Sequence, residues 1–353
     1  MHKLRTMNTN RSILSPQFFS LEGADVHSET TRECGLTFSL VSYNILAQVY
    51  VKSSYFPHSP SPCLKWKSRS EAIMSELRNI AADFFCLQEL DEYDSFYKPQ
   101  FDSNGYSSTF VKRSGIKRDG CGILFRRNRA DLLTEEKIDF NDIAKSYPHS
   151  EENNSPANDK ICENSSTKGD LSNPAVRLKR DCVAIMAAFK LRASFPAVIV
   201  VANAHLYWDP ELADVKLEQA KYLLSRLSAF TSMVSEAYEC SPAVVLAGDF
   251  NSTPGDQVYE YLVSGDSGEV GGAFPLRSCY GHTVGEPSFT NCTPDFTDTL
   301  DYIFFSTSPA GFRPVSLLRV PEKDSPDVSG GLPNFLHPSD HLPIGAHFQL
   351  TIP

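Results

Sequence analysis

The stretch Ala243-Val244-Val245-Leu246-Ala247-Gly248-Asp249-Phe250-Asn251 joins an apolar run to a group of polar side chains. The apolar run predicts a buried strand, and its abrupt end predicts that the strand delivers polar groups at its carboxyl end. On extended backbone, side chains two residues apart point to the same side, so Asp249 and Asn251 would lie together. A carboxylate and an amide so placed can orient a water molecule and hold a phosphate oxygen. A turn that merely closes the strand is the alternative.

Other short motifs share this pattern, in which a polar side chain fit for a metal or a phosphate opens or ends an apolar run. They are SYNIL (42–46), LQE (87–89), NAHL (203–206), DYI (301–303) and SDH (339–341). Together with GDFN (248–251), they resemble the endonuclease/exonuclease/phosphatase superfamily, in the order which that family uses. Longer stretches resemble the carbon-catabolite-repressor-4/nocturnin/Angel group of deadenylases, namely residues 41–50, 203–219, 289–304 and 338–343. The resemblance covers roughly residues 36–351.

Alternating strand and helix patterns, without regular βαβ units, predict an α/β fold with mixed strand pairing. The resemblance implies a specific architecture, a four-layer sandwich of two mixed β-sheets flanked by helices. We expect strands at 36–43, 83–90, 105–111, 121–125, 180–191, 196–203, 243–247, 300–305, 315–320 and 344–350. We expect helices at 70–80, 210–238 and 257–263, a further helix through Phe96, and a loop at 48–66.

The motifs span nearly the whole chain, which predicts a single catalytic nuclease/phosphatase domain over residues 34–353. Residues 1–33 are polar and lack apolar periodicity, so we expect a disordered tail. The first twenty residues contain His, Lys and Arg but no acid, which faintly resembles an organelle presequence. Residues 141–174 are dominated by Asn, Ser, Asp, Glu and Lys, which predicts a poorly ordered, low-complexity insertion in a surface loop.

The 353 residues are 41% hydrophobic and carry a formal net charge of −10. This net negative charge excludes non-specific coating of nucleic acid as the function. No apolar run is long enough to cross a membrane. The nine cysteines are scattered singly, which argues against a zinc site or a disulfide framework and favours a reducing compartment. We therefore expect the cytoplasm, with the nucleus as a second compartment and an organelle as the alternative.

Hydrolysis of a phosphodiester needs a water nucleophile and neutralisation of the phosphate, and Mg²⁺ held by oxygen ligands supplies much of this. Glu89 ends an apolar strand, where an unpaired carboxylate would be costly, so an ion or a basic partner is expected. The resemblance implies that Glu89 is the central ligand of Mg²⁺, for which Mn²⁺ can substitute. It also implies that Asn44 supports this metal and that Asp340 lies beside it. A salt bridge of Glu89 to an internal arginine, and a structural turn amide at Asn44, are the alternatives.

The resemblance also implies the catalytic groups. Asp249 would orient or deprotonate the attacking water, or protonate the leaving oxygen, and Asn251 would hold a phosphate oxygen or a second metal. His341 would contact the phosphate with Asp301 as its orienting partner, since an Asp–His pair fixes the imidazole tautomer and favours its charged form. His205 would be a second histidine on the phosphate, with a structural histidine as the alternative.

Substrate binding is implied for a further set of residues. Lys112 matches the phosphate-binding lysine of the family. Trp208, Pro210, Asn291 and Phe296 match positions at which deadenylases of this group stack or wedge the terminal adenines. Stacking gives roughly 1–3 kcal/mol per base. Packing in the core or in a loop is the alternative for Trp208 and Phe296.

The implied function is a Mg²⁺-dependent 3′-to-5′ exoribonuclease that shortens the poly(A) tails of mRNA and releases 5′-AMP, with single-stranded poly(A) RNA as its partner. A nocturnin-like NADP(H) 2′-phosphatase, another nucleotide phosphatase, and an inactive RNA-binding relative are the alternatives. In the NADP(H) phosphatases two basic residues follow the histidine of the NxHL motif, whereas here Tyr207 and Asp209 take those places. No leucine-rich repeat block precedes the motifs, so stable membership of a large deadenylase complex is not expected.

Overall fold

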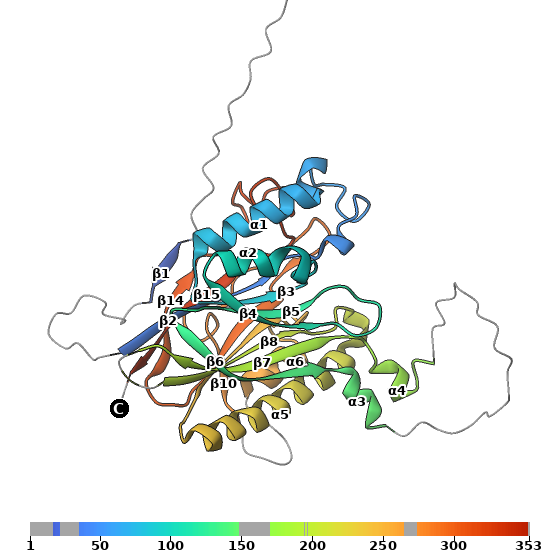
Figure 1. The fold of residues 1–353 in the computed structure, drawn as a ribbon. Helices are drawn as coiled ribbons and strands as arrows, with labels where there is room; N and C mark the ends of the chain where they lie inside the picture. The colour runs from blue at the N-terminus through green and yellow to red at the C-terminus, as the bar shows by residue number, and fades with distance from the viewer. Residues whose placement is uncertain are drawn as a thin grey trace, which may run out of the picture.

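The computed structural model describes residues 17–21, 35–147, 170–193, 195, 197–264 and 274–351. These residues form two large mixed β-sheets that pack face to face, with helices on both outer faces (Figure 1). The four-layer sandwich implied by the resemblance is therefore confirmed. No helix within the described ranges is both long enough and apolar enough to span a membrane.

The first sheet has the strand order β1-β14-β15-β2-β3-β5-β4, and only its β2–β3 pair is parallel. Helices α1 (Trp66–Ile80) and α2 (Lys98–Ser103) cover its outer face, where Ile73, Leu77 and Phe101 pack on the strands (Figure 1). The strands are β1 (Phe18–Ser20), β2 (Gly35–Asn44), β3 (Phe84–Gln88), β4 (Tyr106–Lys112), β5 (Gly120–Arg126), β14 (Phe312–Leu318) and β15 (Ile344–Thr351).

The second sheet has the order β10-β13-β9-β8-β7-β6, and only its β8–β9 pair is parallel. The long helix α5 (Ala213–Tyr238) and the short helix α6 (Gln257–Ser264) cover its outer face with Leu223, Leu227 and Leu262. The strands are β6 (Ala130–Asp139), β7 (Val183–Leu191), β8 (Ala197–His205), β9 (Ala243–Asp249), β10 (Leu276–Ser278) and β13 (Asp301–Ser306).

The parallel pairs explain why polar groups gather at one end of the sandwich. Parallel neighbours end at the same edge of a sheet, so Asn44 lies opposite Gln88 in the first sheet and His205 lies opposite Asp249 in the second. Strand β13 runs antiparallel to β9 and starts at that edge, with Asp301 opposite Asp249. The turns after β2, β3, β8 and β9 therefore face the start of β13.

Several expectations about the chain ends and loops are wrong. Phe18–Ser20, placed in the disordered tail, forms β1 on the edge strand β14, and the Phe18 ring stacks on His347 at 4.2 Å. The insertion expected at 141–174 is ordered at both ends, because helix α3 (Asn141–Lys145) and helix α4 (Pro174–Arg177) occupy them. Its middle, residues 148–169, lies outside the described residues, as do residues 1–16 and 22–34 of the tail.

Short elements fill the connections that the sequence left as loops. Helix α1 begins at Trp66 rather than at residue 70, and the segment expected to be a loop contains two 3₁₀ turns. Strand β6 was not expected, because charged residues interrupt its apolar alternation. The remaining elements are η1 (Gln48–Tyr50), η2 (Ser61–Leu64), the π-helix η3 (Tyr93–Tyr97), η4 (Pro210–Leu212), and the small hairpin of β11 (Asn291–Cys292) and β12 (Thr297–Asp298).

A buried arginine on α1 holds two of the loops at this end of the sandwich together. Arg69 is 1% exposed. Its Nη2 donates to the carbonyl oxygens of Ile45 and Leu46, and its Nε donates to the carbonyl oxygen of Pro338 at 2.7 Å. Its Nη1 donates to the side chain of Gln48. The turn after β2 and the loop before β15 are therefore tied to the same guanidinium group.

We expect Arg69→Met to lower the free energy of unfolding by about 3 kcal/mol or more, because hydrogen bonds from a charged group contribute about 1.5–3 kcal/mol each. Urea denaturation followed by circular dichroism measures the change. Arg78→Met, at an exposed position on the same helix, is the matched control and should change stability little. Equal effects of the two substitutions would show that the Arg69 contacts contribute nothing specific.

Candidate active site

Side chains from both sheets meet at this end of the sandwich through one amide. Asn44 is the last residue of β2, and its Nδ2 donates to Glu89 Oε1 at 3.2 Å and to Asp249 Oδ2 at 2.9 Å. Glu89 follows β3 of the same sheet, whereas Asp249 ends β9 of the other sheet. One amide group thus joins the carboxylates of two sequence motifs, LQE and GDFN, to its own motif, and all three lie far apart along the chain.

The backbone around these residues is strained. Leu46, Glu89 and Asn251 have positive φ values of 54°, 55° and 48°. Left-handed backbone is unfavourable for residues with a side chain, and such residues cluster at functional sites, where the surrounding structure enforces them. Here the strain turns the chain after β3, so that Glu89 Oε2 accepts a hydrogen bond from the Ala47 amide at 2.9 Å. The carboxylate is held in place from two sides.

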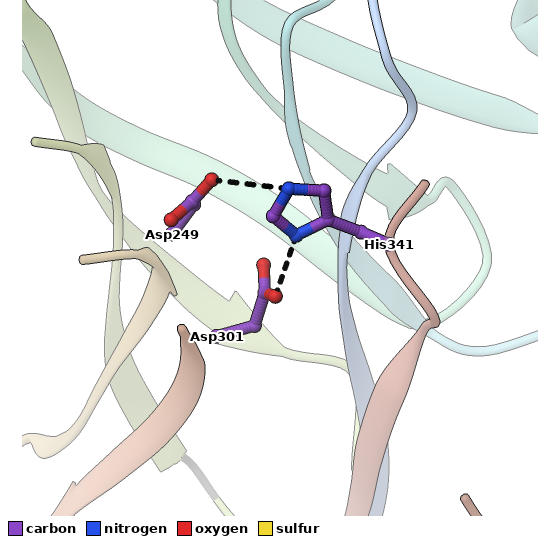
Figure 2. Close-up of side chains that lie close together, drawn as sticks. All are labelled: Asp249, Asp301 and His341. Atoms are coloured by element: carbon purple, nitrogen blue, oxygen red, sulfur yellow. Dashed lines mark hydrogen bonds and ion pairs between the residues drawn. The ribbon is translucent and has the colours of Figure 1, made fainter. Parts of the chain in front are cut away.

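A second group of side chains faces Asp249 from β13 and the segment before β15 (Figure 2). His341 Nδ1 donates to Asp301 Oδ2 at 2.8 Å, and His341 Nε2 lies 3.7 Å from Asp249 Oδ2 (Figure 2). His205 Nε2 lies 3.6 Å from the same oxygen. Two imidazoles therefore converge on one carboxylate oxygen, and the predicted residues Asn44, Glu89, Asp249, His205, Asp301 and His341 share one site.

The two histidines differ in charge. Burial alone would lower the pKa of His341, but the facing carboxylates of Asp301 and Asp249 raise it well above its ordinary value. Burial, and then the charge of Arg113, lower the pKa of His205 well below its ordinary value. Burial, and then the charge of Asp301, raise the pKa of Asp249. The site thus combines an imidazolium, a neutral imidazole, and a carboxyl group suited to exchanging a proton with water.

The surroundings of Glu89 fit a divalent cation. Burial, followed by the charges of Asp119 and Asp340, raises the pKa of the Glu89 carboxyl to about 7. Asp119 is fully buried, and its Oδ2 accepts no hydrogen bond from the described residues, although Arg113 Nη1 lies 3.6 Å from it. Excess carboxylate oxygen of this kind is what Mg²⁺ and Mn²⁺ bind. Glu89, with Asp340 and the Asn44 amide nearby, would hold the ion.

A second group also meets the distance requirement for a metal. Asp249, Asp301 and His341 each place one ligand atom within 4.8 Å of the others (Figure 2). However, Asp301 Oδ2 already accepts hydrogen bonds from His341 and from Thr290 Oγ1, the latter at 2.6 Å. This hydrogen bonding fixes the orientation of the His341 imidazole.

The GDFN motif is a strand followed by a sharp turn. The Asn251 amide nitrogen donates to Asp249 Oδ1 at 3.0 Å, and Asn251 Nδ2 donates to the carbonyl oxygen of Leu206. The expectation that the strand stays extended through Asn251 is therefore wrong, because the backbone turns there, with a φ of 48°. The closing turn, considered as the alternative, is what the structure contains, and Asn251 has one amide hydrogen bond committed to the neighbouring motif.

A cavity of about 500 Å³ opens beside these groups. Glu89, His205, Asp340 and Trp208 line it, and Trp208 is 65% exposed. Lys112 is an exposed residue outside the lining, whereas Arg113 and Lys117 are part of the lining.

The other residues expected to bind substrate also lie outside the lining of this cavity. Pro210 is exposed in η4, and Phe296 is 44% exposed in the turn between β11 and β12. Asn291 is buried and forms a bridge with His341, which fixes the backbone of the histidine. Asn291 therefore supports His341 from the backbone side.

Several residues of the site were not expected from the sequence. Thr290 Oγ1 accepts from the amides of Leu300 and Asp301 and donates to the Asp301 carboxylate. Ser339 Oγ donates to the carbonyl oxygen of Asn44 at 2.7 Å. Asp119 directly precedes the apolar strand β5, which is the same signal that identified the other motifs. Thr290 and Ser339 carry no such signal.

Residues 41–341 match the model of the Endonuclease/Exonuclease/phosphatase family. The chain is 57% identical over 329 residues to "Carbon catabolite repressor protein 4 homolog 4" of Arabidopsis thaliana, covering 90% of this chain and 78% of that protein. It is 30% identical over 371 residues to the "CCR4-Not complex 3'-5'-exoribonuclease subunit Ccr4" of Aspergillus oryzae, covering 88% of this chain and 47% of that protein. The chain thus spans about half the length of this fungal relative.

Solved structures give the same picture. ANGEL2, described as a 2′,3′-cyclic phosphatase and bound to adenosine-2′,3′-vanadate, superposes with a TM-score of 0.72 at 26% identity, covering 97% of this chain and 100% of that one. The human Nocturnin catalytic domain superposes with a TM-score of 0.65 at 23% identity, covering 96% and 98%, and supports the fold alone.

We expect Glu89→Gln to weaken Mn²⁺ binding by more than about tenfold, because loss of even an outer partner of a metal ligand costs 10–100-fold. Electron paramagnetic resonance titration of Mn²⁺ gives the Kd, and circular dichroism checks the fold. Glu71→Gln, at an exposed position on α1, should leave the Kd unchanged. An unaltered Kd in Glu89→Gln would place the ion elsewhere.

Thr290→Val should slow hydrolysis of bis-para-nitrophenyl phosphate by about tenfold to a hundredfold, as expected for a lost hydrogen bond to a charged group. The loss should fall on kcat rather than KM, since Thr290 touches Asp301 and not the substrate. Thr290→Ser keeps the hydroxyl and should restore the rate. A Ser variant as slow as the Val variant would mean that the methyl group, and not the hydrogen bond, matters.

Proposed function

This chain belongs to the endonuclease/exonuclease/phosphatase family, and on that basis we propose that it is a Mg²⁺-dependent 3′-to-5′ exoribonuclease that shortens poly(A) tails and releases 5′-AMP. The observation that carries the proposal is the convergence of Glu89, Asp249 and the Asp301–His341 pair on one site. The relatives named as 3′-5′ exoribonuclease subunits, at about 30% identity, support the direction and the type of cleavage.

Each residue of the site would have its own role in hydrolysis. A divalent cation at Glu89 would supply Lewis-acid stabilisation of the phosphate. Protonated His341, oriented by Asp301, neutralises a phosphate oxygen. Asp249 exchanges a proton with the attacking water or with the leaving oxygen. His205 is neutral and donates one hydrogen bond without repelling the cation.

Exposed aromatic rings beside the metal site support a substrate with bases. Trp208 is 65% exposed and Tyr55 is 62% exposed, and both line the cavity. Bases stack on exposed aromatic faces for roughly 1–3 kcal/mol each. The cavity volume of about 500 Å³ suits one nucleotide at the cleavage site.

The ANGEL2 similarity favours a second candidate, hydrolysis of a terminal 2′,3′-cyclic phosphate. That reaction uses the same phosphate-binding groups, since the attacked phosphate lies at the same 3′ end. NADP(H), the substrate of the 2′-phosphatase alternative, is a third substrate to be compared.

One panel of substrates tests the function. In Mg²⁺, the wild-type protein should shorten a 5′-labelled oligo(A) from its 3′ end and release 5′-AMP, and EDTA should stop the reaction. Asp249→Asn should be inactive on every substrate. If oligo(A) stayed intact while adenosine 2′,3′-cyclic phosphate or NADPH was hydrolysed, the proposed substrate would be wrong.

Trp208→Ala should reduce turnover of oligo(A) by about tenfold to a hundredfold, which is the loss of one stacked base. Hydrolysis of bis-para-nitrophenyl phosphate should change little, because that substrate has no base to stack. Phe296→Ala, outside the cavity, should have the smaller effect on oligo(A). A larger loss from Phe296→Ala would move the adenine site to the β11–β12 hairpin.

A further inference from the structure

The cavity carries cations that the hydrolytic chemistry described above does not use. Lys117 enters it from the loop between β4 and β5, and Lys179 and Arg180 enter it from the segment between α4 and β7. All three line the same cavity as Glu89 and Asp340. The cavity is therefore acidic where the metal would bind and basic on the walls built by these two loops.

Arg180 is held in place without being neutralised. Its Nη1 donates to the carbonyl oxygens of Val176 and Lys179, at 3.1 and 2.8 Å, and its guanidinium group lies 5.3 Å from the centre of the Tyr207 ring. Carbonyl oxygens and a ring face orient the cation but leave its full charge. Arg177, three residues earlier, differs, because that side chain pairs with Asp214 at 2.7 Å.

Lys117 is placed in the same way, with its Nζ 5.5 Å from the centre of the Tyr50 ring, which also lines the cavity. Asp181 also lines the cavity, but among the described residues it forms no ion pair with these cations, and its Oδ1 accepts from Asn141 Nδ2 at 2.8 Å. Arg113 is not part of this set, because it faces the buried Asp119 at 3.6 Å and donates to the carbonyl oxygen of Asp181.

We propose that Lys117, Lys179 and Arg180 form a second phosphate subsite, which binds the phosphate next to the one being hydrolysed. The proposal rests on the proposed function, under which this phosphate is the neighbouring phosphodiester of the RNA backbone. The ion at Glu89 and the His341 imidazolium neutralise the first phosphate, so these three cations are available to the second.

Solvated loop charge is the ordinary explanation for exposed lysines and arginines. It accounts poorly for this set, because two separate loops direct their cations into one cavity and ring faces hold two of them, Lys117 and Arg180. A phosphodiester bound there would also bring the adjoining base to the exposed face of Trp208, which lines the same cavity. The subsite would thus distinguish an RNA end from a simple phosphate ester.

A neutral backbone linkage tests the subsite. Oligo(A) carrying a single methylphosphonate next to the scissile phosphate should have a KM about tenfold to a hundredfold higher than unmodified oligo(A) with the wild-type protein. With the variant Lys117→Ala/Arg180→Ala, both substrates should have the same high KM. Hydrolysis of bis-para-nitrophenyl phosphate should be unchanged in the variant. Arg118→Ala removes a charge from the same loop outside the cavity and should behave as wild type.

Two outcomes separate this proposal from the proposed function. If the methylphosphonate raises KM equally in wild type and variant, the second phosphate is bound elsewhere and the subsite is wrong. If the wild-type protein leaves oligo(A) intact, the proposed function falls, and NADPH is used as an inhibitor of bis-para-nitrophenyl phosphate hydrolysis instead. A higher inhibition constant in the variant then supports the subsite with a dinucleotide phosphate, and an unchanged constant overturns it.

Discussion

The active end of this protein depends on the hydrogen bonds that the Asn44 amide donates to Glu89 and Asp249. These two carboxylates belong to different sheets, so the sandwich must close before the site exists. A second amide reinforces the closure, because buried Asn203 on β8 donates to the carbonyl oxygens of Leu87 and Gly122 on the opposite sheet. Asn203 therefore stabilises the packing of the two sheets. Its motif, NAHL, was identified from the chemistry expected of His205.

Buried charge and backbone strain are the main features of this arrangement that destabilise the folded protein. Burial, and then repulsion from the carboxylates of Asp119 and Asp340, raises the pKa of Glu89 to about 7. Left-handed backbone at Glu89 and Asn251 adds about 1–3 kcal/mol per residue. A divalent cation at Glu89 would relieve the repulsion, and a bound phosphate would neutralise the buried imidazolium charge of His341.

Most of the fold was predictable because the strands that form the centres of the sheets are continuous apolar runs, as in β8 and β9. The edge strands were not, since β1 has three residues and β6 is interrupted by charge. In the site, carboxylates and histidines at strand ends carried a readable signal. Thr290 carried no such signal. No sequence pattern around it marks a hydroxyl that orients Asp301 through hydrogen bonds. Lys112 was chosen by position along the chain, whereas the cavity is lined by the side chain of the next residue, Arg113.

We infer that the ion binds at Glu89 and that His341 faces the phosphate from the other side. Anomalous diffraction from crystals soaked with Mn²⁺ and 5′-AMP tests it most directly. We expect a manganese peak at coordination distance from the Glu89 carboxylate, with the phosphate between the ion and His341 Nε2. A peak among Asp249, Asp301 and His341, with none at Glu89, would contradict it.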